Sequence, residues 1–127
     1  IVKAPIARHP IHRKKMAIVK GGRTSHTDFH TLKLLNESAH VEAKLHTGRT
    51  HQIRVHLQHL GNPLIGDKVY GGRAARVFSQ TTGYKALRQM LHASELGFTH
   101  PTSGKPILVK APLPADFVDA LDYLQIS

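Results

Sequence analysis

Apolar and polar residues alternate between Thr24 and Leu35, and this period of two predicts a β-strand. One side of that strand is expected to carry Thr27, Phe29, Thr31 and Lys33. Alternation resumes in VEAKLH, residues 41–46, after the turn-like segment NESAH, residues 36–40. The two alternating segments therefore predict an antiparallel hairpin with NESAH as its loop.

The period of the apolar residues changes after Gly48. Ile53, Leu57 and Leu60 recur at the spacing of one helical face, so THQIRVHLQHLG predicts a helix of about three turns that ends at a glycine. Thr50 is the expected N-cap of this helix. A second helix is predicted for PADFVDALDYLQ, residues 114–125. Its buried face is expected to hold Phe117, Leu121 and Leu124.

The remaining segments predict further strands joined by loops. Residues 1–3, 91–100 and 107–112 are interpreted as strands, with a turn in HPTSGKP between the last two. GDKVYGGR and SQTTGYKALRQM, residues 66–73 and 79–90, are interpreted as a glycine-rich loop and a surface excursion without regular structure. Strands in hairpins with two separate helices predict an α+β fold, a mostly antiparallel or mixed β-sheet with a few packed helices. Residues 1–127 are predicted to form a single region rather than two domains.

The net charge of the chain indicates the kind of partner that it binds. It has 18 Lys and Arg against 8 Asp and Glu, a net charge of +10, and this imbalance favours a polyanionic partner such as RNA. The first 27 residues contain no acid and supply the candidate RNA contacts Arg8, Arg13, Lys14 and Lys15. An anionic membrane is the competing partner, but the chain has no basic amphipathic helix and no apolar run of about 20 residues, so no membrane association is predicted. The absence of Cys excludes disulfides and thiolate metal sites, and it fits a cytoplasmic protein.

The motifs of several reaction classes are missing. Eleven His invite a metal-site hypothesis, and His56 and His59 lie three residues apart on the predicted helix. However, no HExxH occurs, no carboxylate lies between Glu42 and Asp67, and nearby arginines would repel a dication, so no metal site is predicted. The chain also lacks GxSxG, a P-loop and GxGxxG, which argues against a serine hydrolase and a nucleotide-binding enzyme.

The stretch TGRTHQIR, residues 47–54, is interpreted as an anion-binding turn, with a solvated basic face as the alternative. A glycine turn that leads into a helix presents backbone N–H groups, and Arg49, Thr50 and His51 add donors for a phosphate. Arg54 lies between the apolar Ile53 and Val55, and a partly buried arginine needs a carboxylate partner. The sequence leaves that partner open, with an ordinary ion pair to Asp67 or Glu42 as one alternative.

Three longer stretches carry a family resemblance. TGRTHQIRVHLQHLGNPLIGDKVYGG, LHASELGFTHPTSGKPILVKAPLP and PIARHPIHRKKMAIVKGGRTSHTDF together resemble the C-terminal half of the catalytic domain in RluA/RluD-type RNA pseudouridine synthases. The resemblance extends over nearly the whole chain, and the pattern GRTHQIRVHL-x2-LG-x-P-x2-GD-x2-YG is long and specific.

The resemblance implies an activity and roles for two residues. Such enzymes isomerise uridine in RNA without a cofactor, and similarity to the members that act on large-subunit ribosomal RNA implies that substrate, in the cytoplasm and as a monomer. Their catalytic group is an Asp in a motif like HRLDxxTSG, helped by a Tyr. The basic residue that pairs with that Asp corresponds to Arg54, and an apolar residue of the base pocket corresponds to Leu91.

The chain departs from the family in one respect, because it has no HRLDxxTSG. Asp28, in HTDFH, lacks the surroundings of that motif. The chain also begins without Met inside a predicted strand, so we expect the catalytic Asp and Tyr to lie upstream of Ile1 and the 127 residues alone to be inactive. Two alternatives stay open: a non-catalytic RNA-binding module derived from such an enzyme, and a basic ribosome-associated structural protein.

Overall fold

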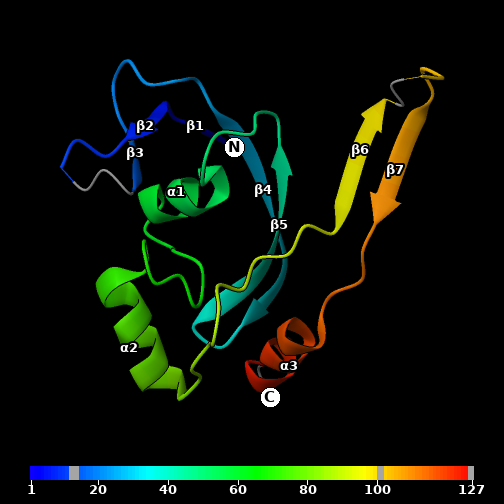
Figure 1. Ribbon diagram of the computed structural model, residues 1–127. Coiled ribbons are helices and arrows are strands. Elements are labelled where there is room, and N and C mark those ends of the chain that lie inside the picture. The colour runs from blue at the N-terminus through cyan, green and yellow to red at the C-terminus, as the bar shows by residue number, and fades with distance from the viewer. Residues whose placement is uncertain (12–14, 100–101, 126–127) are drawn as a thin grey trace.

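The computed structural model describes residues 1–11, 15–99 and 102–125 and contains three antiparallel sheets (Figure 1). In the largest, β4 (His26–Leu35) pairs with β5 (Ser38–Leu45) on one edge and with β1 (Val2–Lys3) on the other. The predicted hairpin is therefore confirmed. Its loop is shorter than NESAH, because Leu35 already pairs with Ser38. The turn is closed by Asn36 and Glu37, and Glu37 has a positive φ of 55°.

The predicted alternation along β4 holds only in its first half. Thr31 pairs with Val41, but the next pair joins Lys33 to His40, so Leu32 is an extra residue on β4. Such a β-bulge shifts the following side chains relative to the partner strand. The interpretation that put Lys33 in one row with Thr27 and Thr31 is therefore wrong beyond Thr31.

Two smaller hairpins complete the strands. The first joins β2 (Ile6–Arg8) to β3 (Met16–Ile18), and the second joins β6 (Glu95–Thr99) to β7 (Pro106–Lys110). Figure 1 shows β6 and β7 extending away from the other strands. The predicted strands over 91–100 and 107–112 are confirmed in these shorter spans, and the α+β class is confirmed.

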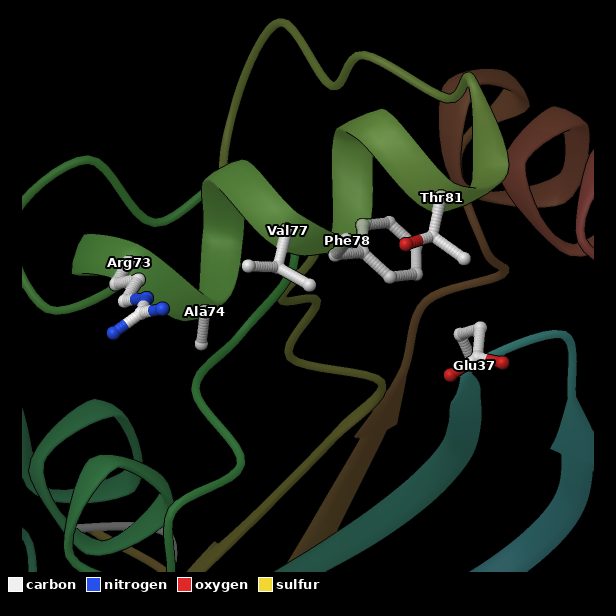
Figure 2. Close-up of a pocket in the computed structure, with 6 residues that line it drawn as sticks. All are labelled: Glu37, Arg73, Ala74, Val77, Phe78 and Thr81. Carbon is white, nitrogen blue, oxygen red and sulfur yellow. The ribbon is translucent and has the colours of Figure 1, made fainter.

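Two of the three helices of the described chain were predicted. α1 (Gln52–His59) and α3 (Ala115–Tyr123) occupy the expected segments, but α2 (Gly72–Thr82) falls where the sequence predicted a loop and an irregular excursion. That prediction is wrong. Ala74, Val77, Phe78 and Thr81 follow the spacing of one helical face. They line a hollow of about 410 Å³, and Figure 2 shows Glu37 of the β4–β5 turn across from this face. No residue of α2 is fully buried.

The small apolar core positions α1. Ile6, Val55 and Tyr70 are buried against one another, and Met16 and Ile18 pack onto them. α1 thereby contacts β3 on one side and β4 on the other. In the described part of the chain, no helix has both the length and the apolar character needed to cross a membrane.

Candidate functional site

Arg54 and Asp67 form a buried ion pair next to the core. Arg54 Nε donates to Asp67 Oδ2 at 2.8 Å and Arg54 Nη2 donates to Oδ1 at 2.9 Å, so the contact is bidentate. The side chains are 13% and 0% exposed. The sequence left Asp67 and Glu42 open as ordinary ion-pair partners of Arg54, and in the structure Arg54 pairs with Asp67. Among the described residues, the third guanidinium nitrogen, Nη1, makes no hydrogen bond.

The loop after α1 is shaped to hold Asp67. The N–H groups of Val69 and Tyr70 both donate to Asp67 Oδ1 at 3.0 Å. A Cβ on Gly71 would lie 2.3 Å from the carbonyl oxygen of Asp67, so only glycine lets the chain fold back so tightly there. Burial by itself raises the pKa of Asp67, but the hydrogen bonds from Arg54, Tyr70 and Val69 outweigh it and the pKa is lowered. Asp67 is therefore a permanent anion at neutral pH.

Tyr70 connects the ion pair to the turn before α1. Its hydroxyl oxygen accepts from Met16 N–H at 2.9 Å and lies 2.8 Å from His51 Nδ1, while Arg54 Cζ lies 4.9 Å from the ring centroid. A neutral His51 with its proton on Nε2 would accept the hydroxyl proton at Nδ1. Burial, followed by the charge of Arg54, lowers the pKa of His51 and keeps it neutral. Tyr70 is the tyrosine of the GD-x2-YG part of the family pattern, but no role could be assigned to it from the sequence because its partners are distant along the chain.

The start of α1 differs from the prediction. Thr50 is not its N-cap: His51 precedes the helix with a positive φ of 54° and no side chain caps the helix. Instead, Gln52 folds back, and its Oε1 accepts from Thr47 Oγ1 at 2.6 Å and from Arg49 N–H at 3.0 Å. The turn is thus held by an amide side chain from inside the helix, which fixes Thr50 and His51 at its outer end.

Beneath this turn lies a buried polar network that the sequence analysis missed. His56 is 0% exposed, and its ring nitrogens lie 2.7 Å from Ser25 Oγ and 2.8 Å from Thr27 Oγ1. Ser25 Oγ donates to the carbonyl of Ala4, and Gln52 Nε2 donates to Thr27 Oγ1 at 2.9 Å. Ser25 Oγ can then accept a hydrogen bond from His56 Nε2, and Thr27 Oγ1 can donate one to His56 Nδ1. These two contacts fit a neutral imidazole with its proton on Nε2. Burial lowers the pKa of His56 accordingly.

The predicted RNA contacts fall into two groups. Arg49 donates from Nε to the carbonyl of Thr24 at 2.8 Å, and Thr50 is exposed beside it. Arg8 is exposed on β2, and Lys15 adjoins the neighbouring strand β3 next to Met16. The hydrogen bond from Met16 to Tyr70 brings this hairpin to the side of His51. Arg13 and Lys14 lie outside the described residues.

Leu91 belongs to a segment that runs beside the Asp67 loop. Met90 N–H donates to the carbonyl of Ile65 at 2.8 Å, two residues before Asp67. Arg88 anchors the same segment to α3 by a bidentate ion pair with Asp116, at 2.6 and 2.9 Å. Leu91 itself is half-buried. Its assignment to a base pocket stays a prediction.

Comparison with known proteins gives a consistent result. A family model described as RNA pseudouridylate synthase matches residues 1–59. Ribosomal large subunit pseudouridine synthase D of Nitrosomonas europaea is 43% identical over 125 residues, which cover 98% of this chain and 36% of the relative. The protein of the same name from Pseudomonas aeruginosa is 44% identical over 129 residues, covering 98% of this chain and 40% of the relative. Among solved structures, human RNA pseudouridylate synthase domain containing 1 matches 87% of this chain and 46% of its own, with a TM-score of 0.69 and 32% identity. The chain thus spans less than half the length of these relatives.

Proposed function

The chain belongs to the RNA pseudouridine synthase family, and we propose that it forms the positive wall of the uridine pocket in an enzyme that modifies large-subunit ribosomal RNA. The observation that carries this proposal is the Arg54–Asp67 pair. Asp67 occupies two of the three guanidinium nitrogens from the protein side and leaves Nη1 for another acceptor.

Arg54 is then placed to assist a second carboxylate. In this proposal, the catalytic Asp of the family is supplied by the part of the enzyme that this chain does not contain, and it accepts a hydrogen bond from Arg54 Nη1. A guanidinium in a largely buried site lowers the pKa of such a carboxylate and keeps it ionised for attack on the nucleoside. Asp67 makes this possible because it fixes the plane of the guanidinium and balances its charge.

The reaction itself adds and removes nothing. The N1–C1′ bond of uridine breaks, the base rotates, C1′ bonds to C5, and the proton on C5 is lost as N1 gains one. No oxidant, reductant or cofactor is needed. The target base must leave its stack to reach the pocket. Arg49, Thr50 and His51 hold the neighbouring RNA backbone, and Leu91 lines the base pocket.

A chimera tests the proposal. This chain replaces the matched 129 residues of the Pseudomonas aeruginosa relative, and pseudouridine is mapped chemically in large-subunit ribosomal RNA. We expect the chimera to form pseudouridine and the 127 residues alone to form none. In the chimera, Arg54→Ala should abolish turnover, and Arg54→Lys should restore part of it because lysine keeps the charge but not the fork.

The outcomes separate the alternatives. A chimera that folds and binds RNA without product favours a non-catalytic RNA-binding module. Product from the 127 residues alone contradicts an external catalytic Asp, and Asp28 and Asp67 would then be the first positions to substitute. We further propose that the enzyme acts in the cytoplasm, as a monomer and without a cofactor.

A further inference from the structure

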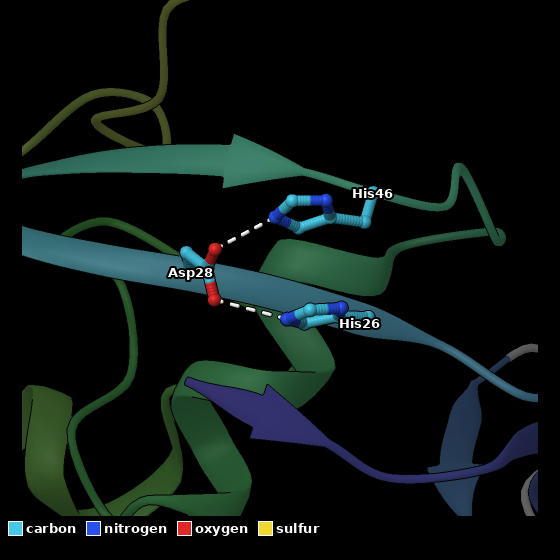
Figure 3. A group of neighbouring side chains, drawn as sticks. All are labelled: His26, Asp28 and His46. Atoms are coloured by element: carbon cyan, nitrogen blue, oxygen red, sulfur yellow. Dashed lines mark hydrogen bonds and ion pairs between the residues drawn. The ribbon is translucent and has the colours of Figure 1, made fainter.

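Three potential metal ligands meet on the β4–β5 hairpin, away from the Arg54 site (Figure 3). His26 and Asp28 belong to β4, two residues apart and hence on one face of the strand, and His46 directly follows β5. His26 Nε2 lies 3.0 Å from Asp28 Oδ1, and His46 Nε2 lies 2.6 Å from Asp28 Oδ2. Figure 3 shows both imidazole rings turned toward the one carboxylate.

We propose that His26, Asp28 and His46 form a binding site for a divalent transition metal of the Zn²⁺ type. Their ligand atoms lie within 4.8 Å of one another. Two imidazole nitrogens and one carboxylate oxygen form a ligand set that Zn²⁺ accepts, with the fourth position left to water. The same nitrogen-rich set disfavours Mg²⁺ and Ca²⁺, which prefer oxygen ligands.

The backbone already holds both histidines where they are needed. His46 N–H donates to the carbonyl of His26 at 3.1 Å, and His26 N–H donates to Thr47 Oγ1 at 2.9 Å. Gln52 Nε2 donates to the same carbonyl of His26 at 2.9 Å. The two rings are stacked, with centroids 4.0 Å apart and planes inclined by 17°. These contacts hold both histidines beside Asp28 before any ion binds.

Proton exchange connects the hydrogen-bonded and metal-bound forms. In the present arrangement each Nε2 carries a proton and donates it to Asp28. A metal ion would replace the two protons that the histidines share with Asp28. Each imidazole would then bind the ion through the lone pair of Nε2, and its proton would move to Nδ1 or to solvent. The side chains of Asp28 and His46 are 36% and 38% exposed, so an ion reaches them from water. Lys44 pairs with Asp28 across the strands, and its positive charge should lower the affinity for a cation.

A bound ion would act on the turn that precedes α1. His46 is followed directly by Thr47, whose hydroxyl bonds to Gln52, the side chain that also holds Arg49 N–H. Fixing His46 to β4 through a metal would therefore restrict the Arg49–His51 turn. The site is thus a positioning element for that turn, distinct from the residues proposed to meet the uridine.

Metal titration of the untagged chain tests the proposal. The protein is stripped with chelator, and Zn²⁺ affinity is measured by competition with a chromophoric chelator, with Co²⁺ absorption as a second readout of coordination. We expect one equivalent to bind, with low-micromolar affinity and no competition from Mg²⁺. His46→Gln and Asp28→Asn should each weaken binding by roughly tenfold or more. His59→Gln, at an exposed site on α1, is the matched control and should leave the affinity unchanged.

Each alternative outcome contradicts the proposal. Absence of a stoichiometric site means that the cluster is a hydrogen-bonded His–Asp–His contact only. Equal affinity in the His46→Gln and unsubstituted chains means that other histidines bind the ion. Circular dichroism of each variant checks that the fold is intact, and histidine ¹⁵N chemical shifts report metal coordination at His26 and His46 independently of affinity. None of these measurements depends on synthase activity, so their failure leaves the proposed function untouched.

Discussion

The Arg54–Asp67 pair should contribute strongly to stability, and a double-mutant cycle measures how much. Asp67 is 2% exposed and accepts four hydrogen bonds, two from Arg54 and two from the backbone of Val69 and Tyr70. Arg54→Met keeps most of the side-chain volume but leaves a buried carboxylate without its cation. Removing one partner of a buried pair costs about 3–5 kcal/mol. We expect about 3 kcal/mol, because the two backbone donors remain.

The second single variant and the double variant complete the cycle. Asp67→Asn keeps an acceptor for the backbone N–H groups but turns an amide N–H₂ toward the guanidinium, so it should cost about 2–3 kcal/mol. The double variant Arg54→Met/Asp67→Asn contains neither a buried carboxylate without its cation nor an amide N–H₂ that faces a guanidinium. The double variant should therefore cost less than the sum, with a coupling energy of about 2 kcal/mol. Urea unfolding of the four proteins, followed by circular dichroism with a common m-value, gives these numbers.

The pH dependence supplies an independent check on the same pair. Because the pKa of Asp67 is lowered in the folded protein, the unfolded chain binds the proton more readily. The stability from Asp67 is thus fully present above about pH 4 and is lost as the pH falls through its folded pKa. In Arg54→Met, burial is no longer offset by the guanidinium and the folded pKa of Asp67 rises, so the loss of stability at acid pH should shrink or reverse. A coupling energy below about 0.5 kcal/mol, or an unchanged acid limb, would refute the reasoning.

Three further predictions use other parts of the structure. His56→Ala should destabilise the chain by about 3 kcal/mol, since it leaves a cavity and two buried hydroxyls with a lost partner. Because burial lowers the pKa of His56, the stability that depends on its neutral form is present above about pH 6.5 and is lost below it, and His56→Gln should flatten this part of the urea-unfolding profile. Gly71→Ala should cost about 2 kcal/mol by thermal or urea unfolding because the new Cβ meets the Asp67 carbonyl, whereas Gly48→Ala, whose new Cβ would have no atom within 4 Å, should be neutral. RNA affinity, measured by fluorescence anisotropy with a ribosomal stem–loop, should fall roughly tenfold or more between about 50 and 200 mM salt, and a flat response would contradict a phosphate-binding surface.

Local patterns predicted the existence and type of two elements. The β4–β5 hairpin and helix α1 follow from alternation and from the spacing of Ile53 and Leu57. The face of α1 marked by that spacing is not the buried one, because the helix buries Gln52, Val55 and His56 instead. α2 was missed because the glycines before it and the polar residues SQTT at its end were interpreted as loop, although Ala74, Val77, Phe78 and Thr81 follow the spacing of one helical face. Gly83, whose positive φ of 75° closes α2, was the available signal for its end.

Side-chain partners were harder to predict than elements. Arg54 could be placed as a buried cation in need of a carboxylate because its neighbours in sequence are apolar. The contacts of His51 with Tyr70 and of Asp28 with His46 join residues 19 and 18 positions apart. The geometry of these contacts depends on strand register and on the fold of the Asp67 loop. Neither can be predicted from the spacing of residues along the chain. The same holds for Thr50, where the fold-back of Gln52 replaces the expected cap.

The long motif from Thr47 to Gly71 behaves as one physical unit. Gln52 holds the turn at Arg49, Arg54 binds Asp67, and the backbone of Gly71 folds against the Asp67 carbonyl. Contacts within the motif itself therefore explain many of its residues without reference to RNA binding. Loss of activity in a motif variant consequently does not identify a catalytic residue, because loss of the pair or the loop has the same effect. Arg54→Lys is the informative substitution: it preserves the charge that a second carboxylate needs while removing the fork that Asp67 holds. If its activity falls far more than its stability, the third guanidinium nitrogen has a role beyond the pair, and if both fall together, Arg54 acts only by holding Asp67.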